Sequence, residues 1–165
     1  MEKLPILNQE QIKHKVRRIA YQIYESNMNE KEIILAGIAR NGYELAKKIE
    51  TELISISPLK ISLCKVEIDK KQPLNEIKTS LTSEEYKGRS VILVDDVLNS
   101  GTTLIYGVRH FLNVPLKQFK TAVLVDRNHK KYPVKADFKG ISLSTSLSET
   151  VKVILEENNE RVELS

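Results

Sequence analysis

Apolar residues recur with a helical period in three parts of this chain. After Asn8, whose side chain can cap a helix, apolar residues return every three or four positions from Ile12 to Tyr24. The same spacing recurs from Leu45 to Leu53, and the stretch 102–113 has the length and pattern of a third helix. Each pattern predicts a helix that buries one stripe of side chains.

Short, nearly continuous apolar runs lie between these predicted helices. They cover residues 32–38, 60–66, 91–94 and 120–125, and two shorter candidates cover 136–141 and 151–155. Continuous runs of this kind are typical of strands that are covered on both faces. Strands that alternate with helices indicate right-handed crossovers and a parallel sheet. The predicted fold class is therefore α/β, an open, mostly parallel sheet flanked by helices.

One stretch, residues 67–88, fits neither pattern. It is polar, contains Pro73 and has no sustained period. Irregular segments of this length are usually functional or disordered, and this one leaves the end of the second strand, where open α/β sheets bind ligands. We expect a flexible loop at about 67–88 that closes over a ligand. Because no repeat or linker interrupts the chain, residues 1–165 are predicted to form a single domain.

Composition narrows the function classes. Hydrophobic residues make up 41% and charged residues 29% of the chain, which is typical of a globular protein. The lone cysteine, Cys64, excludes an internal disulfide and a clustered-thiolate metal site. No apolar run approaches the roughly 18 residues of a membrane span, and the first residues do not resemble a signal peptide. We therefore expect a soluble cytoplasmic protein with no membrane partner.

The net charge of +4 permits an anionic partner without requiring one. Basic residues gather in two clusters. Residues 13–18 include four basic side chains and no acid, and residues 127–139 include five basic side chains opposed only by Asp137. Each cluster is equally consistent with a solvated face and with a surface that binds an anion.

The segment from Val91 to Leu104 carries the most specific chemistry. Four apolar residues run directly into Asp95 and Asp96, and a turn of small residues, 99–103, then opens a helix. Buried carboxylates need hydrogen-bond donors or a cation, and a vicinal diol supplies two donors. The amides and hydroxyls of 99–103 at a helix N-terminus suit a phosphate. Together these features indicate a ribose 5-phosphate site; the alternative is that the acids only cap the helix.

This segment resembles the motif by which type I phosphoribosyltransferases bind phosphoribosyl pyrophosphate (PRPP). Residues 122–129, 133–140 and 144–149 resemble one subgroup, the bacterial pyrimidine-operon attenuators that are also uracil phosphoribosyltransferases. The N-terminal helix and residues 37–42 fit the same subgroup, so the resemblance covers nearly the whole chain. It implies a type I phosphoribosyltransferase fold with a small C-terminal hood, and a homodimer or higher homo-oligomer.

The resemblance also implies roles for individual residues. Asp95 and Asp96 would hold the ribose hydroxyls. The 5-phosphate would lie in a cradle formed by Asn99, Ser100, Gly101, Thr102 and Thr103. Pyrophosphate would bind to Ala39, Arg40, Asn41 and Gly42, with Arg40 as the catalytic cation. The cofactor would be Mg²⁺, bound mainly through PRPP.

Base recognition would fall to Arg127, Phe138 and Lys139. The resemblance implies that Phe138 stacks on the base, that the backbone around Lys139 reads its edge, and that Arg127 donates to a carbonyl oxygen; the alternative for Phe138 is an ordinary core aromatic. Purine-specific relatives have an acid at the position of Asn99 and a lysine at that of Asp126. Both differences argue against a 6-oxopurine and favour uracil.

The chain departs from this subgroup at the entrance to the flexible loop. The attenuator enzymes have an Arg-Asp-Asp stretch there, whereas this chain has residues 63–69 without arginine. If that arginine closes the site, catalysis is weak unless Lys65, Lys70 or Lys71 replaces it. Two hypotheses result. The first is an enzyme that transfers ribose 5-phosphate from PRPP to a nucleobase, with uracil expected; the second is a nucleotide-sensing, RNA-binding regulator of pyrimidine genes with weak or no catalysis.

Overall fold

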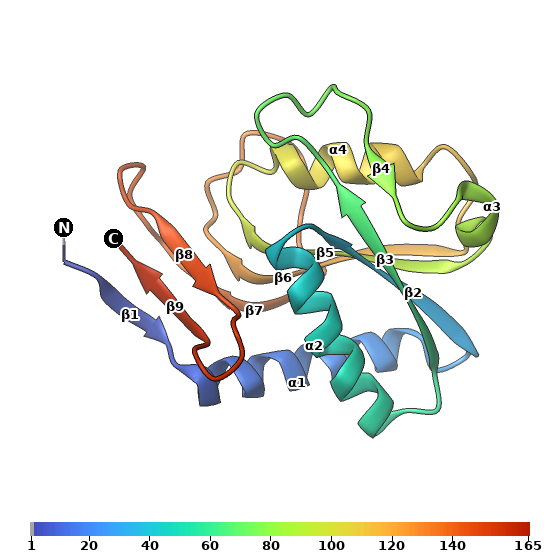
Figure 1. Ribbon diagram of the computed structural model, residues 1–165, viewed down its shortest axis with the longest axis horizontal. Coiled ribbons are helices and arrows are strands. Elements are labelled where there is room, and N and C mark those ends of the chain that lie inside the picture. Colours follow the sequence, from blue (N-terminus) through green and yellow to red (C-terminus); the bar gives the residue numbers. More distant parts are fainter. Residues whose placement is uncertain (1) are drawn as a thin grey trace.

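The computed structural model describes residues 2–165, and their strands form two sheets (Figure 1). The larger sheet has the strand order β4 (Lys78–Thr79), β3 (Lys60–Glu67), β2 (Glu32–Ile38), β5 (Ser90–Leu98), β6 (Gln118–Asp126) and β7 (Phe138–Ser142). All neighbours in it are parallel except the β3–β4 pair. The predicted α/β class, with a mostly parallel sheet, is confirmed.

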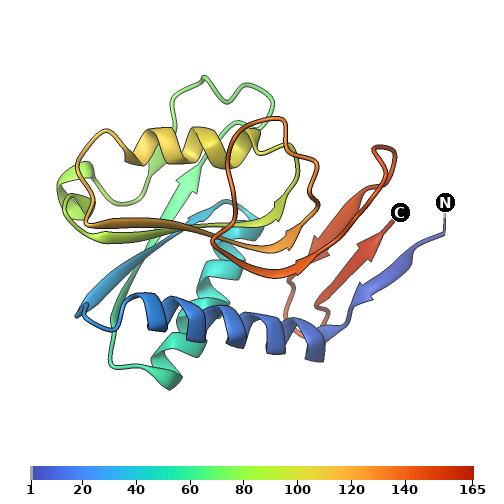
Figure 2. The same ribbon diagram turned by 180° about the vertical axis from the view of Figure 1, so that it is seen from behind.

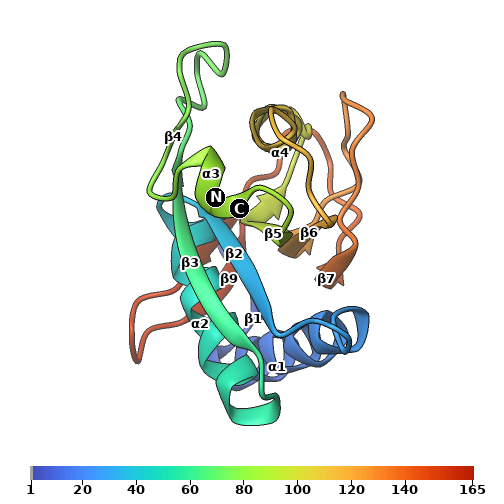
Figure 3. The same ribbon diagram turned by 90° about the vertical axis from the view of Figure 1, so that its right-hand side faces the viewer.

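Helices cover both faces of the larger sheet (Figures 1 and 3). On one face lie α1 (Gln9–Ser26) and α2 (Asn41–Ile56); on the other lie α4 (Thr102–Phe111) and the short α3 (Ser83–Tyr86). Each face encloses its own apolar cluster, because alternate residues of a strand point to opposite sides. Ile92, for example, packs toward α1 and α2, whereas Leu93 packs toward α4.

The N-terminal helix forms as its sequence pattern predicts. Asn8 caps α1: its Oδ1 atom accepts a hydrogen bond from the Gln11 amide at 2.8 Å, and its own amide donates to Gln11 Oε1 at 2.9 Å. This reciprocal pair satisfies two of the amides that a helix start leaves unbonded. The buried stripe consists of Ile12, Val16, Ile19, Ala20 and Ile23. No helix within residues 2–165 has the length and apolar character needed to cross a membrane.

The smaller sheet brings the two ends of the chain together beside the larger sheet (Figures 1 and 2). Its order is β1 (Leu4–Leu7), β9 (Arg161–Leu164) and β8 (Val151–Ile154), with both pairs antiparallel. We call this sheet the hood. Of its strands, only β8 was predicted from the sequence, because only β8 lies in one of the apolar runs identified there, residues 151–155.

The stretch 67–88 is more regular than its sequence predicts. It contains β4 and α3, so the prediction of one irregular loop over the whole stretch was wrong for its second half. Tyr86 of α3 is buried, and its ring centroid lies 4.8 Å from that of Phe111 in α4. This long-range packing fixes elements of two and four residues that leave no local pattern. We call the irregular segment that remains, residues 68–77, the active-site loop, because a loop here was expected to close over a ligand.

Candidate functional site

The two adjacent acids lie within β5, at the carboxyl end of the larger sheet. The sequence predicted that the strand ends before these acids, but it continues to Leu98. Asp96 Oδ2 accepts a hydrogen bond from Asn41 Nδ2 at 3.1 Å, and Asp95 Oδ1 accepts one from the Asp96 amide at 2.9 Å. No lysine or arginine among residues 2–165 forms an ion pair with either carboxylate. The edge therefore holds two acids with spare acceptor capacity.

Burial dominates the electrostatics of Asp95. Asp95 is only 3% exposed. Its burial raises the pKa of its carboxyl group well above the usual value, the negative charge of Asp96 raises it further, and the positive charge of Lys70 opposes the shift. Two like charges at a buried position are unfavourable without donors or a cation. The pair is therefore suited to a ligand that brings hydroxyl donors.

The loop from Asn99 to Thr103 faces the acids and leads into α4. Gly101 has a φ of +88°, and a Cβ there would lie 2.6 Å from Val134 Cγ1, so this turn requires glycine. The Ser100 and Thr102 hydroxyl oxygens are 2.8 Å apart. Loop, acids and Lys70 line one cavity of about 80 Å³. The structure thus brings together the residues predicted to hold ribose and the 5-phosphate.

The predicted pyrophosphate segment, residues 39–42, joins β2 to α2 beside the same acids. A Cβ on Gly42 would lie 2.6 Å from Val94 O and 3.0 Å from Asp95 Cα, so glycine allows the start of α2 to approach β5. Besides Asp96, Asn41 Nδ2 bonds Val153 O of the hood at 2.9 Å. Arg40 is exposed and faces a second cavity, shared with the active-site loop. Sequence reasoning missed the link from Asn41 to the hood.

The residues predicted to read the base occupy different environments. Phe138 is 8% exposed and packs in the core cluster beneath α1, which is the alternative role considered for it. Lys139 Nζ lies 3.7 Å from Asp126 Oδ2, and that carboxylate also accepts from the Asn128 amide. Arg127 directs its guanidinium toward Asn99 and the segment 145–149. Arg127 therefore reaches the site through Asn99, whereas Phe138 and Lys139 do not line its cavity.

The structure separates the three lysines that could replace the missing loop arginine. Lys70 lines the cavity that contains Asp95 and Asp96. Lys65 instead lies over the Tyr43 ring, with Nζ 5.9 Å from its centroid. Asp69 holds the active-site loop in shape, since its Oδ1 atom accepts from the amides of Lys71 and Gln72. Of the three lysines, only Lys70 lines this cavity.

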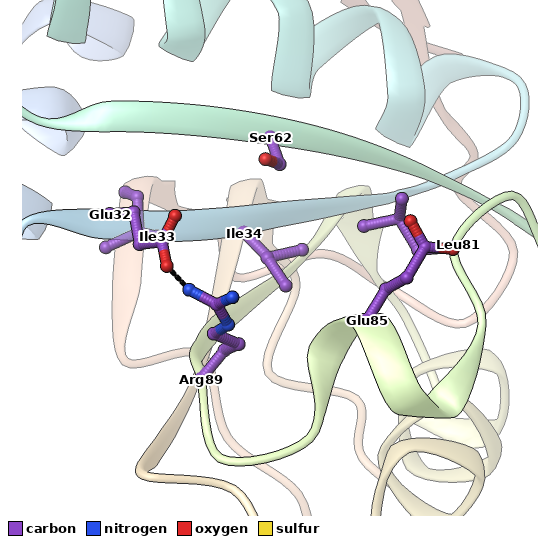
Figure 4. Close-up of a pocket in the computed structure, with 7 residues that line it drawn as sticks. All are labelled: Glu32, Ile33, Ile34, Ser62, Leu81, Glu85 and Arg89. Atoms are coloured by element: carbon purple, nitrogen blue, oxygen red, sulfur yellow. Dashed lines mark ion pairs between the residues drawn. The ribbon is translucent and has the colours of Figure 1, made fainter.

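A larger cavity, of about 200 Å³, lies toward the amino end of the strands (Figure 4). Its lining includes Glu32 and Arg89, which form an ion pair, together with Ser62, Leu81 and Glu85. No residue predicted to act in the site lines it. Open α/β sheets bind ligands at the carboxyl ends of their strands, so the smaller cavity is the candidate site despite its size.

Comparisons with known proteins identify the family of the chain. Residues 5–157 match the model of the phosphoribosyl transferase domain. The chain is 36% identical over 162 residues to the "Bifunctional protein PyrR" of Streptococcus thermophilus, covering 95% of this chain and 92% of that protein. The protein of the same name from Alkaliphilus metalliredigens is 35% identical over 160 residues, covering 92% of this chain and 88% of that protein.

A solved structure supports the fold. A hypoxanthine-guanine phosphoribosyltransferase from Bacillus anthracis superimposes with a TM-score of 0.77 at 18% identity, covering 98% of this chain and 96% of that one. At this identity the likeness concerns the fold alone. The match to the domain model over most of the chain, together with relatives above 30% identity, shows that this chain belongs to the phosphoribosyltransferase family.

Proposed function

We propose that this protein transfers ribose 5-phosphate from PRPP to uracil and releases pyrophosphate. The observation that carries the proposal is the pair Asp95, which is buried, and Asp96, which is partly buried; neither has an ion-pair partner among residues 2–165, and both lie beside the phosphate-type loop 99–103. The carboxylates that can accept from a diol and the loop that can donate to a phosphate are thus only a few residues apart in the chain. PRPP carries a diol and a 5-phosphate on the same ribose.

In this proposal the protein orients PRPP and stabilises the leaving group. Asp95 and Asp96 accept hydrogen bonds from the ribose hydroxyls, and the loop 99–103 donates to the 5-phosphate. Arg40 and the neighbouring amides hold the pyrophosphate as the glycosidic bond breaks. The transition state resembles an oxocarbenium ion, so the chemistry depends on positioning and electrostatics rather than on a strong general base.

Lys70 is proposed to close this site from the active-site loop. Its side chain reaches the acid-lined cavity, and its charge opposes the raised pKa of Asp95. Ile68, two residues earlier, supports this placement: its Cδ1 atom lies 3.5 Å from the point where a Cβ on Gly107 of α4 would stand. We infer that the charge of Lys70 partly offsets that of the acid pair in the free protein, without an ion pair, and that Lys70 turns to a PRPP phosphate oxygen on binding.

Phosphoribosyltransferases generally use Mg²⁺ with PRPP, and the donor set here fits a cation that arrives with its substrate. The site offers carboxylate and hydroxyl oxygens, which Mg²⁺ prefers. Within residues 2–165 no three His, Cys, Asp or Glu side chains gather into a preformed cage. Asp95 and Asp96 would contact the ion through the ribose hydroxyls. When bound, it would neutralise charge on the leaving pyrophosphate.

Uracil is the proposed acceptor because two residues disfavour a 6-oxopurine. Asn99 has an amide of negligible basicity where purine-specific relatives have an acid. Asp126 places a buried carboxylate where they have a lysine donor, so the 6-oxo oxygen of a purine would lack a donor there, and an unpaired acceptor costs about 1–3 kcal/mol. We expect kcat/KM for uracil to exceed that for hypoxanthine or guanine by about 100-fold. The backbone around Lys139 would read the uracil edge, with Arg127 bordering the pocket.

The proposal is tested by measuring pyrophosphate release from PRPP against uracil, hypoxanthine and guanine. Turnover with uracil alone, lost in Asp96→Asn, is the expected result. A better rate with either purine would overturn the proposed acceptor. Failure to bind PRPP, measured by calorimetry with Mg²⁺, would overturn the reaction itself.

A second function, RNA binding by a pyrimidine-gene regulator, is favoured by the exposed basic face of α1. Lys13, Arg17 and Arg18 are exposed there, opposite the buried stripe, although Arg17 also pairs with Glu52 at 3.2 Å. Lysine and arginine contacts to phosphates release counterions, so RNA affinity should fall steeply with salt. Lys13→Gln with Arg18→Gln should weaken RNA binding and reduce that salt slope. An unchanged slope would overturn this function.

We further propose that the protein acts as a homodimer or higher homo-oligomer in the cytoplasm.

A further inference from the structure

Arg127 makes more polar contacts than any base-reading role requires. Its Nε atom donates to Thr145 Oγ1 at 3.0 Å, and its Nη1 atom donates to Asn99 Oδ1 at 3.1 Å. Its Nη2 atom donates to two backbone carbonyl oxygens, that of Ser146 at 3.2 Å and that of Glu149 at 2.6 Å. An arginine has five N–H donors in a rigid planar fork, so these four bonds leave one donor.

The partners of Arg127 belong to two parts of the chain that lie far apart in the sequence. Asn99 begins the phosphate loop. Residues 145–149 form the irregular segment that leads from β7 into β8 of the hood. The fork therefore spans from the PRPP cradle to the segment that enters the hood.

The far end of that segment is held to the site as well. β8 begins at Val151, and the carbonyl oxygen of Val153 accepts the bond from Asn41, whose amide also donates to Asp96. Residues 145–153 are thus fastened at one end to the phosphate loop and at the other to the ribose acids. Each of these two links depends on one side chain, that of Arg127 or that of Asn41.

We infer that Arg127 is a positioning residue which fixes Asn99 in the PRPP cradle and holds residues 145–149 over the base side of the pocket. The inference rests on the proposed function, because it concerns the site for PRPP and the base. It assigns to Arg127 an indirect role: the residue acts through Asn99 and through the hood segment rather than by contacting uracil. A lysine cannot replace it, because an ammonium group lacks the planar fork.

A double-mutant cycle between Arg127→Lys and Asn99→Ala tests the link to the cradle. The dissociation constant of PRPP with Mg²⁺ is measured by calorimetry without base. Arg127→Lys should raise it about tenfold in the otherwise unchanged protein, or about 1.4 kcal/mol. In the Asn99→Ala background the same change should have less than about a twofold effect, because the partner is already gone. Equal effects in both backgrounds would overturn the role in the cradle.

Hydrogen exchange in the ligand-free protein tests the link to the hood segment. The amides of 144–150 should exchange faster in Arg127→Lys, and to a smaller extent in Thr145→Val, which removes one bond. Arg109→Lys makes the same chemical change at an exposed arginine of α4 and should leave exchange there unchanged. Unaltered exchange in Arg127→Lys would overturn the inference. Because this measurement needs no ligand, it remains decisive even if the wild-type protein fails to bind PRPP.

Discussion

Two charged side chains are paired with each other at one end of the larger sheet, whereas two at the other end are unpaired among residues 2–165. At the amino end, Glu32 and Arg89 carry opposite charges, form an ion pair, and remain 39% and 45% exposed. At the carboxyl end, Asp95 and Asp96 carry like charges, lie side by side, and have no ion-pair partner among residues 2–165. In the first arrangement the two charges neutralise each other without a ligand, so its role is structural. The second is unfavourable until a ligand supplies donors, and this difference supports the assignment of the functional site to the carboxyl end.

The largest effect should come from neutralising the carboxyl end. Changing Asp95 and Asp96 together to Asn removes both charged acceptors while keeping side-chain volume, so PRPP affinity should fall by at least about 100-fold with the fold intact. Calorimetry with Mg²⁺ measures the affinity, and circular dichroism checks the fold. Glu32→Gln, the same change at the amino end, is the control and should bind PRPP normally. A folded double variant with unchanged affinity would contradict the assignment.

Crowding the carboxyl end should have the next largest effect. In Gly42→Ala the new Cβ would collide with Val94 O and press on Asp95, so PRPP affinity should fall by about tenfold or more. Gly88→Ala is the matched control: Gly88 has a φ of +70°, but a Cβ added there would have no atom within 4 Å. That control should lose about 1 kcal/mol of stability and keep its PRPP affinity. Equal loss of binding in both variants would show that strain, not crowding, is responsible.

Removing the one lysine in the acid-lined cavity should have a smaller effect. Lys70→Gln should raise the KM for PRPP about tenfold, because one charge-assisted contact is worth about 1.5–3 kcal/mol before screening by solvent. Lys71→Gln removes an identical charge from the neighbouring position, which does not line the cavity. Steady-state kinetics at several salt concentrations would separate the two. Equal changes in KM would indicate general electrostatic attraction instead.

The buried acid at the carboxyl end should make the stability of the folded protein depend on pH. In the folded protein the pKa of Asp95 is raised, chiefly by burial, whereas in the unfolded chain the group ionises near its usual value. Between these values the folded state binds more protons, so raising the pH through this window lowers the contribution of Asp95 to stability. Asp95→Asn should therefore gain stability relative to wild type as the pH rises above the usual pKa of an aspartate, about 3.9. Urea unfolding measures this gain; a difference that is constant with pH would contradict it.

The smallest effect should come from the amino end. Arg89→Gln breaks a largely exposed ion pair, and such pairs contribute at most about 1 kcal/mol. Thermal unfolding should register a slight loss, and PRPP affinity should not change. A loss of PRPP affinity in this variant would remove the distinction between the two ends.

Sequence reasoning succeeded where structure depends on local pattern. The run 32–38 became β2 without a change of boundary, and the cap at Asn8 became the start of α1, because burial and capping leave marks within a few residues. The approach of Asp95, Asn99 and Asn41 was also expected, since it follows from the parallel strand order and the recognised motif.

Sequence reasoning failed where structure depends on distant partners. The hood strands β1 and β9 are four residues each, and α3 is fixed by the packing of Tyr86 on Phe111. The sequence left Phe138 open between a base-stacking and a core position, because the register of β7 against β6, which places Phe138 opposite Ala122, cannot be read from local pattern. The four bonds of Arg127 reach residues 18 to 28 positions away. None of these contacts has a signature in a single sequence.

The order of strands in the hood has a consequence for synthesis on the ribosome. β9 lies between β1 and β8, so both outer strands lack their partner until residues 161–164 have been made. The acids of β5 and the loop before α4 emerge about a third of the chain earlier. A nascent chain would thus complete its PRPP cradle before its hood, and the bond from Asn41 to Val153, 112 residues apart, would be among the last to form.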